Sequence, residues 1–117
     1  MKIRKSIPER RTVDGIVFDS ILEAEHYVNL RALQARGIIR ELRCGPKFVF
    51  EVNGIQIGHY RADFSFIETA TNRPKVQDVK GWKKSSKTGK LLPRVDKGFR
   101  LRANLMKACF GLEVELV

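Results

Sequence analysis

Cysteine is scarce in this chain, whose 117 residues include only Cys44 and Cys109. With His26 and His59, the only histidines, they form none of the closely spaced pairs from which zinc sites are built. Two cysteines far apart in the sequence also give no disulfide framework. The fold therefore depends on its hydrophobic core, in which we expect both cysteines to be free, buried thiols.

Long hydrophobic runs are missing as well. No apolar stretch approaches the roughly 18 residues of a membrane span, and the Met-Lys-Ile-Arg-Lys start is not followed by the apolar segment of a signal peptide. The sequence thus favours a soluble intracellular protein with no membrane partner. With 43% hydrophobic residues, we expect one globular domain over residues 13–117, preceded by a flexible basic arm over residues 1–12.

Acidic residues are fewer than basic residues, and the basic excess is distributed unevenly along the chain. The chain has 23 Lys and Arg against 13 Asp and Glu, a formal net charge of +10. Residues 1–11 carry five basic residues and one acid, and residues 80–107 carry ten and one, whereas residues 12–79 carry eight and nine. Such segregation predicts salt-dependent attraction to a polyanion such as a nucleic-acid backbone. A solvated basic face without a dedicated ligand is the alternative, since charge runs are common.

A first helix is predicted at about residues 20–36. Ser20 and Glu23 are spaced as in a capping box, in which the serine hydroxyl accepts a hydrogen bond from a first-turn amide. An apolar stripe recurs every three residues, at Ala24, Tyr27, Leu30 and Leu33. Gly37 supplies the stop, because glycine tolerates the positive φ of a helix C-terminus.

The middle of the chain is typical of antiparallel strands. Asn53-Gly54, the strongest short hairpin signal, separates two hydrophobic runs. A second helix is expected at about residues 96–110, ending at Gly111. The other predicted elements are strands at 48–52, 55–57, 60–67 and 75–80, a turn at 69–74, a basic loop at 81–94 and a terminal strand at 112–117. The expected order is αβββαβ, give or take strand subdivisions.

Three acids and one lysine have a spacing that chemistry can use. Asp78 and Lys80 lie two apart in a predicted strand, so they share one face of it. If the strands around Asp63 and Asp78 are neighbours, two carboxylates meet, and a divalent cation relieves their repulsion most simply. Glu23 can add a third carboxylate from the start of the first helix. Lys80 would then stand beside the ion, where an ammonium can position water or offset charge on a phosphate.

The order and spacing of these motifs resemble the PD-(D/E)XK nuclease superfamily, and within it small phage-encoded nucleases akin to the phage junction-resolving endonuclease I. The resemblance covers about residues 12–112. The segments that carry it are Asp14–Tyr27, Gly37–Leu42, Pro46–Phe48, Tyr60–Phe64 and Gln77–Gly81. It implies a restriction-endonuclease-like αβββαβ core of the α/β (α+β) class, with a mixed central sheet flanked by helices.

The resemblance also implies an activity, that of a Mg²⁺-dependent DNA endonuclease for which Mn²⁺ substitutes. Its implied catalytic residues are Glu23, Asp63, Asp78 and Lys80, and its implied metal ligands are Glu23, Asp63, Asp78 and the carbonyl of Val79. Ala62 stands where the superfamily motif has proline, and Asp78 is the shorter of the two permitted acids. Neither departure removes a ligand, so both concern only the fine geometry.

Basic residues of the predicted loop and second helix are candidates for gripping backbone phosphates. The predicted DNA-binding residues are Trp82, Lys83, Lys84, Lys87, Lys90, Arg94, Lys97, Arg100, Arg102 and Lys107. Arg102 stands about where related nucleases often carry a lysine. Trp82 either stacks on a base or wedges a branch point, or simply packs on the protein.

Structural roles compete with several of these assignments. Glu23 is explained by its capping box alone, and Lys80 can simply pair with Asp78. Asp63 and Asp78 can be solvated edge-strand acids, although an unpaired carboxylate among apolar neighbours is costly. Tyr27 and Phe64 are expected in the core.

Two further features of the sequence are not expected to contribute to function. The segment Gly81–Thr88 superficially resembles a phosphate-binding loop, but Ser86 occupies the place of the required glycine before the lysine. We therefore expect no nucleotide cofactor. His59 lies near Asp63 in the sequence but is not expected to act as a general base, which nucleases of this superfamily do not usually need.

The leading hypothesis is a structure-selective nuclease that cuts four-way junctions or other branched or double-stranded DNA in phage recombination, repair or processing. Junction resolution needs two cuts and the chain supplies one site, so a homodimer is expected. The implied location is the cytoplasm of a bacterial or phage-infected host cell. The alternative is a catalytically silent nuclease-fold module that binds nucleic acid or inhibits a host factor; a structural or assembly protein is a third possibility.

Overall fold

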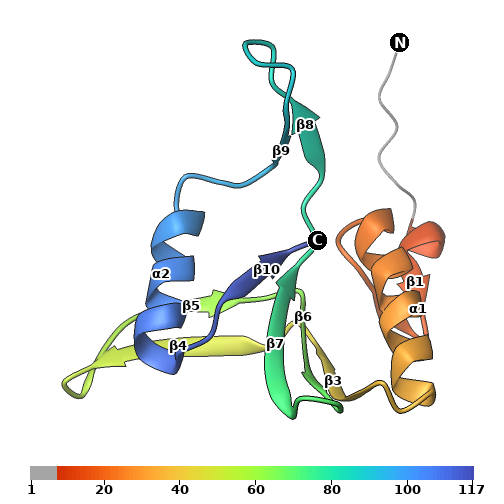
Figure 1. Cartoon of the computed structure of the whole chain (residues 1–117), viewed down its shortest axis with the longest axis horizontal. Coiled ribbons are helices and arrows are strands. Elements are labelled where there is room, and N and C mark those ends of the chain that lie inside the picture. The colour runs from red at the N-terminus through yellow and green to blue at the C-terminus, as the bar shows by residue number, and fades with distance from the viewer. Residues whose placement is uncertain (1–7) are drawn as a thin grey trace.

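The computed structural model describes residues 8–117, which form a mixed α+β fold with two α-helices and a mixed central sheet (Figure 1). The elements in chain order are η1 (Pro8–Arg11, a 3-10 helix), β1 (Thr12–Val13), β2 (Ile16–Val17), α1 (Ile21–Ala35), β3 (Ile39–Cys44), β4 (Lys47–Val52), β5 (Ile55–Arg61), β6 (Phe64–Glu68), β7 (Arg73–Asp78), β8 (Trp82–Lys84), β9 (Leu91–Pro93), α2 (Phe99–Phe110) and β10 (Val114–Leu116). Of the arm predicted at residues 1–12, residues 1–7 lie outside the described part of the chain, and the rest forms η1 and the start of β1.

The central sheet has four strands in the order β10-β7-β6-β3. β6 runs antiparallel to both β3 and β7, whereas β10 pairs with β7 in parallel. Phe64 of β6 lies opposite Gln77 of β7, and side chains alternate along each strand, so different residues line the two faces. α1 packs on one face and α2 on the other (Figure 1).

The predicted first helix is confirmed as α1. Ser20 Oγ accepts a hydrogen bond from the Glu23 N–H at 3.1 Å, as expected for an N-cap serine. Tyr27 and Phe64 lie in the core, as predicted. The buried cluster between α1 and the sheet comprises Phe18, Ala24, Tyr27, Leu30, Ile39, Phe64 and Phe66.

A polar bridge ties α1 to the sheet. His26 Nε2 lies 2.7 Å from Gln77 Oε1, and Gln77 Nε2 donates to Glu115 Oε1 at 2.6 Å. Gln77 is buried, so both ends of its amide find the partners that burial demands. The bridge fixes the helix that carries Glu23 against the strand that ends in Asp78.

The Asn53-Gly54 hairpin is confirmed as the turn between β4 and β5. Both residues adopt positive φ, 52° and 78°, as a tight hairpin turn of this kind requires. The single strand predicted at 60–67 is wrong, because β5 ends at Arg61 and β6 begins at Phe64. The chain passes there from the separate β4–β5 ribbon into the central sheet, and its alternating pattern continues across the break.

The strand predicted at 75–80 is confirmed but shifted, as β7 covers Arg73–Asp78. Pairing with β6 continues through Pro74 to Arg73, which shortens the predicted turn. Proline has no backbone N–H with which to pair with a neighbouring strand. Pro74 is tolerated because β10 pairs with β7 only from Val76 onward, so no strand of the sheet needs that hydrogen bond. Beyond β7, Lys80 N–H still donates to the Val117 carbonyl at 3.0 Å.

The predicted loop at 81–94 contains a hairpin, β8–β9, that projects from the body of the fold (Figure 1). β8 reads Trp-Lys-Lys and β9 reads Leu-Leu-Pro, and segments of three residues are too short to show a periodic apolar signal, so the sequence did not reveal them. The second helix begins at Phe99 rather than at residue 96, and it ends at Gly111, whose φ of 67° confirms the predicted glycine stop. The terminal strand β10 is shorter than predicted.

The second core lies between α2, the β4–β5 ribbon and the sheet. Its buried members are Phe50, Tyr60, Ala62, Val76 and Met106. Cys44 and Cys109 are free, as predicted, but only partly buried. Over residues 8–117, neither helix has the length and apolar character that crossing a membrane requires.

Candidate functional site

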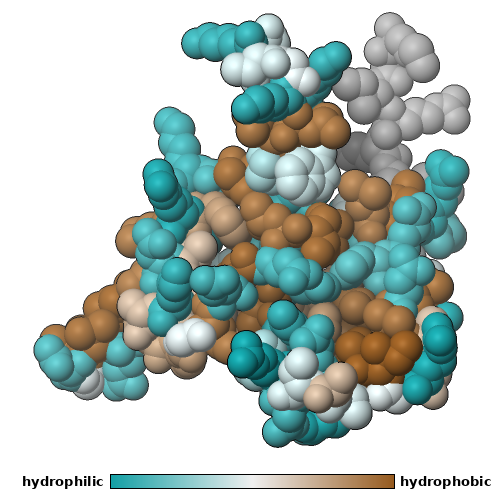
Figure 2. All heavy atoms as spheres, viewed as in Figure 1, coloured by the Kyte–Doolittle hydropathy of each residue, from teal (hydrophilic) through white to brown (hydrophobic). Residues whose placement is uncertain are grey.

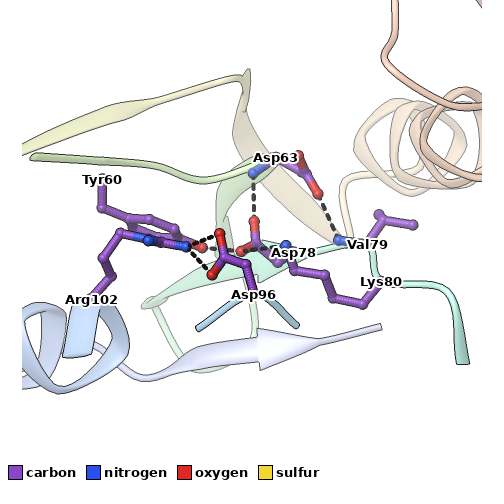
Figure 3. A network of polar contacts seen from close by, with 7 residues as sticks. All are labelled: Tyr60, Asp63, Asp78, Val79, Lys80, Asp96 and Arg102. Carbon is purple, nitrogen blue, oxygen red and sulfur yellow. Dashed lines mark hydrogen bonds and ion pairs between the residues drawn. The ribbon is translucent and has the colours of Figure 1, made fainter. Parts of the chain in front are cut away.

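Two aspartates meet where the β4–β5 ribbon joins the central sheet. Asp63 lies between β5 and β6, and Asp78 is the last residue of β7. Asp78 Oδ1 accepts the Asp63 N–H at 3.0 Å, and Asp63 Oδ2 accepts the Val79 N–H at 2.7 Å (Figure 3). The predicted proximity of these aspartates is therefore confirmed.

Asp78 is deeply buried, with 2% of its surface exposed. Its second oxygen, Oδ2, accepts a hydrogen bond from the Tyr60 hydroxyl, and Lys80 Nζ lies 3.7 Å from the same oxygen. A buried carboxylate needs such partners, because desolvation without them is expensive. The position of Lys80 beside Asp78 confirms that they share one face.

Lys80 belongs to the side of the sheet that faces α2. Its ammonium lies 5.5 Å from the ring centroid of Phe99, the first residue of that helix, and the lysine is only partly exposed. The aromatic face and Asp78 together hold a positive charge at the centre of the site.

Glu23 approaches from the opposite side, on the first turn of α1. It lines a cavity of about 490 Å³ together with Asp19 and Asp63, and Asp63 also lines a neighbouring cavity of about 370 Å³ with Asp78 and Lys80. Burial, followed by the charges of Asp63 and Asp19, raises the pKa of Glu23 to about 7. The structure thus brings Glu23 into electrostatic contact with the aspartates.

The pKa of the Asp63 carboxyl is subject to opposing effects. Burial raises its pKa, the hydrogen bond from Val79 N–H opposes that shift, and the nearby Asp78 charge raises it further. Ionised carboxylates that lie close together repel one another, and a bound cation relieves that repulsion. Their oxygens are also the ligands that a hard divalent cation prefers. The chemistry of the predicted ligands therefore fits Mg²⁺ or Mn²⁺.

The predicted ligands do not lie close enough together to form a complete metal-binding site. Among residues 8–117, no three His, Cys, Asp or Glu side chains are grouped closely enough to hold an ion. Both oxygens of Asp78 are engaged by protein partners. Val79 contacts the cluster through its N–H, and the role of its carbonyl stays a prediction.

The predicted DNA-binding residues occupy the β8–β9 hairpin, the segment that follows β9, and α2. Trp82 is 49% exposed, and hydrophilic side chains gather at the far end of the hairpin (Figure 2). Within the described chain, Lys84, Lys87, Lys90, Arg94, Lys97, Arg100 and Lys107 are all exposed, and the side chain of Lys83 is not described. Lys107 pairs with Glu113 at 3.2 Å.

Arg102 lies at the site itself. It lines the same cavity as Asp78 and Lys80, and its Nη2 donates to both carboxylate oxygens of Asp96, at 2.6 and 2.9 Å (Figure 3). This pairing lowers the pKa of the Asp96 carboxyl. His59 also lines this cavity.

Tyr60 and Asp96 belong to this network but were not among the predicted site residues. Tyr60 stands three residues before Asp63, but its contact with Asp78 depends on how the β4–β5 ribbon folds against β7. Asp96 and Arg102 are six residues apart, which is not a spacing that brings helix neighbours together. Neither contact had a signal in the local sequence.

The raised pKa of Glu23 predicts a stability penalty. The ordinary pKa of a glutamate is 4.5, and in the folded chain the pKa of Glu23 is about 7. An acid whose pKa is higher in the folded than in the unfolded chain destabilises the fold as the pH rises between these two values. In chelator, we expect Glu23→Gln to raise the free energy of unfolding by about 1–2 kcal/mol at about pH 8, a value reduced for solvent screening. Urea unfolding across pH measures this gain, which should shrink toward pH 4.5. The exposed Glu25→Gln on the same helix is the control, and an equal gain there would contradict the explanation.

Comparisons with known proteins give one family. A family model described as "Protein of unknown function (DUF1064)" matches residues 4–106, which is most of the chain. The search of curated proteins returned no match, and neither did the search of solved structures. What the site does must therefore be inferred from its residues.

Proposed function

The chain belongs to the DUF1064 family, and we propose that it is a Mg²⁺-dependent DNA endonuclease that hydrolyses phosphodiester bonds, with Mn²⁺ as a substitute. One observation carries the proposal: Asp63, Asp78 and Lys80 converge at adjoining strand ends, and Glu23 lines a cavity together with Asp63. Acidic ligands can hold the divalent cation of metal-assisted phosphodiester hydrolysis, and an adjacent ammonium can offset charge on the phosphate. The mixed sheet between two helices accommodates the PD-(D/E)XK core that we propose for it.

Each residue of the site has a proposed task. Asp63, Asp78, Glu23 and the Val79 carbonyl would hold the metal. A bound divalent cation lowers the pKa of a coordinated water and offsets phosphate charge. Lys80 orients the attacking water and stabilises negative charge that develops on the phosphate. Its neighbours Asp78 and Phe99 hold the ammonium in place for both tasks.

The proposed substrate is branched or double-stranded DNA, gripped through its phosphates. The charge of the β8–β9 hairpin and α2 supplies the attraction, and the exposed Trp82 can stack on a base or enter a branch point. Contacts of this kind select the shape of DNA rather than its sequence. We therefore propose junction or branch selectivity, in phage DNA recombination, repair or processing, inside the bacterial cytoplasm.

A homodimer completes the proposal. Resolving a four-way junction requires two cuts, and one chain contributes one set of carboxylates. The segment Val49–Gly58 of the β4–β5 ribbon carries Glu51 as its only formal charge. Two strongly basic chains repel each other less where their surfaces carry little charge, so we propose this ribbon as the contact.

Cleavage of a labelled four-way junction tests the proposed function. The junction and a linear duplex of the same sequence are each incubated with Mg²⁺, Mn²⁺ or chelator. We expect paired cuts in the junction with either metal, little cutting of the duplex and none in chelator. Activity that survives chelation would contradict metal dependence, and equal cutting of both DNAs would contradict branch selectivity.

A second candidate is a catalytically silent DNA-binding or host-factor-inhibiting module. It is favoured by the engagement of both Asp78 oxygens by protein donors and by the lack of a finished three-ligand group among residues 8–117. This candidate predicts tight junction binding without cleavage under any metal. It also predicts no Mn²⁺ uptake that depends on Asp78.

A further inference from the structure

Tyr60 is a buried residue whose hydroxyl points at the centre of the site. The residue is 4% exposed, and its ring packs in the cluster that contains Val76 and Met106. The hydroxyl donates to Asp78 Oδ2 (Figure 3). Burial and this hydrogen bond both raise the pKa of Tyr60, so the hydroxyl remains a donor at neutral pH.

The Tyr60 hydroxyl completes a three-point fixation of the Asp78 carboxylate. The Asp63 N–H holds Oδ1 at 3.0 Å, and the Lys80 ammonium stands 3.7 Å from Oδ2. The backbone contact alone leaves the carboxylate free to rotate about that bond, and Lys80 sits on a flexible side chain. The hydroxyl on a ring wedged into the core is therefore the rigid donor to Oδ2.

The ring of Tyr60 is braced from α2. The Arg102 guanidinium lies 6.0 Å from its centroid, and Asp96 holds that guanidinium through two hydrogen bonds. Tyr60 is thereby confined between the hydrophobic core and a cation whose own position is fixed. A ring confined on both sides holds its hydroxyl in one place.

We propose that Tyr60 is a positioning residue that orients the Asp78 carboxylate for a divalent cation. This inference rests on the proposed function, since it assumes that Asp78 is a metal ligand. Groups that orient a metal ligand typically change metal affinity by about 10- to 100-fold when removed. We therefore expect Tyr60→Phe, which removes only the hydroxyl, to weaken Mn²⁺ binding by about 10- to 100-fold.

The chain supplies a matched control in its other tyrosine. Tyr27 also donates its hydroxyl to a carboxylate, Asp14 Oδ2 at 2.9 Å, but it lies in the cluster beneath α1. Tyr27→Phe thus loses the same kind of bond away from the site. A general effect of losing a tyrosine hydroxyl on folding would affect both variants, whereas a positioning role affects only Tyr60→Phe.

Isothermal titration with Mn²⁺ compares the wild type, Tyr60→Phe, Tyr27→Phe and Asp78→Asn. Weaker binding by Tyr60→Phe, with Tyr27→Phe like the wild type, supports the inference. Equal affinity in both tyrosine variants overturns it while leaving the metal site intact. Wild-type uptake no greater than that of Asp78→Asn overturns the proposed function, and the positioning role with it.

A second measurement does not depend on the Tyr60→Phe variant folding. In Tyr27→Phe the only remaining tyrosine is Tyr60, so the tyrosine hydrogen-bond bands of its ultraviolet resonance Raman spectrum report this hydroxyl alone. We expect these bands to shift when Mn²⁺ is added at saturating concentration, because the cation draws charge from the carboxylate that accepts the bond. Unchanged bands during proven Mn²⁺ uptake would contradict contact between Tyr60 and a metal-binding Asp78.

Discussion

Asp78→Asn is expected to lower the rate of junction cleavage by about a thousand-fold or more, while junction binding persists. The substitution removes the buried negative charge at the centre of the proposed metal site. It leaves a side chain of the same size, whose carbonyl oxygen can still accept the Asp63 N–H that now binds Oδ1. Its amide can donate to the Tyr60 oxygen in place of the present bond. The fold should therefore survive the change, and the loss should fall on chemistry.

Single-turnover cleavage and a binding titration on the same junction separate chemistry from binding. Asp14→Asn is the control, since Asp14 is an exposed carboxylate that is engaged by Tyr27 and Arg31 and lines neither cavity of the site. We expect that control to cleave like the wild type. Full activity of Asp78→Asn would remove Asp78 from the proposed mechanism, and loss of binding would point instead to a damaged fold.

Local signals account for what the sequence predicted well. The capping serine and the stripe that includes Tyr27 define α1, and Asn53-Gly54 defines the hairpin, because neighbours in the chain suffice to specify each. The meeting of Asp63 and Asp78 was also predictable, since a turn between two strands makes them adjacent. Such contacts need only short-range information.

Contacts that depend on how distant segments pack together could not be predicted from the sequence. The alternation through Tyr60–Ile67 continues where the chain changes sheets, so the break at Ala62 and Asp63 leaves no mark in the pattern. The bond between Tyr60 and Asp78 depends on that same break. The raised pKa of Glu23 depends on how α1 packs, since burial is its largest cause.

The affinity for DNA is expected to fall by about a thousand-fold or more between roughly 50 and 200 mM salt. Each neutralised phosphate releases a condensed counterion, so the slope of log affinity against log salt counts the phosphate contacts. Arg102 and Lys107 are paired with Asp96 and Glu113 and must give up those contacts to serve the DNA. Lys84, Lys87 and Lys90 of the β8–β9 hairpin are exposed and have no ion pair within the described part of the chain, so they should account for much of the slope.

Neutralising the hairpin tests where the phosphates bind. Replacing Lys84, Lys87 and Lys90 with glutamine should reduce the slope by about three, because each lost contact removes about 0.9. The control replaces Arg36, Arg40 and Arg73 with glutamine, all exposed and located at the ends of α1, β3 and β7 remote from the hairpin (Figure 1). Both triple variants lose the same total charge, so general attraction falls equally and any difference in slope arises from direct contacts. Equal slopes would place the phosphates elsewhere, and a slope near zero in the wild type would contradict nucleic acid as the partner.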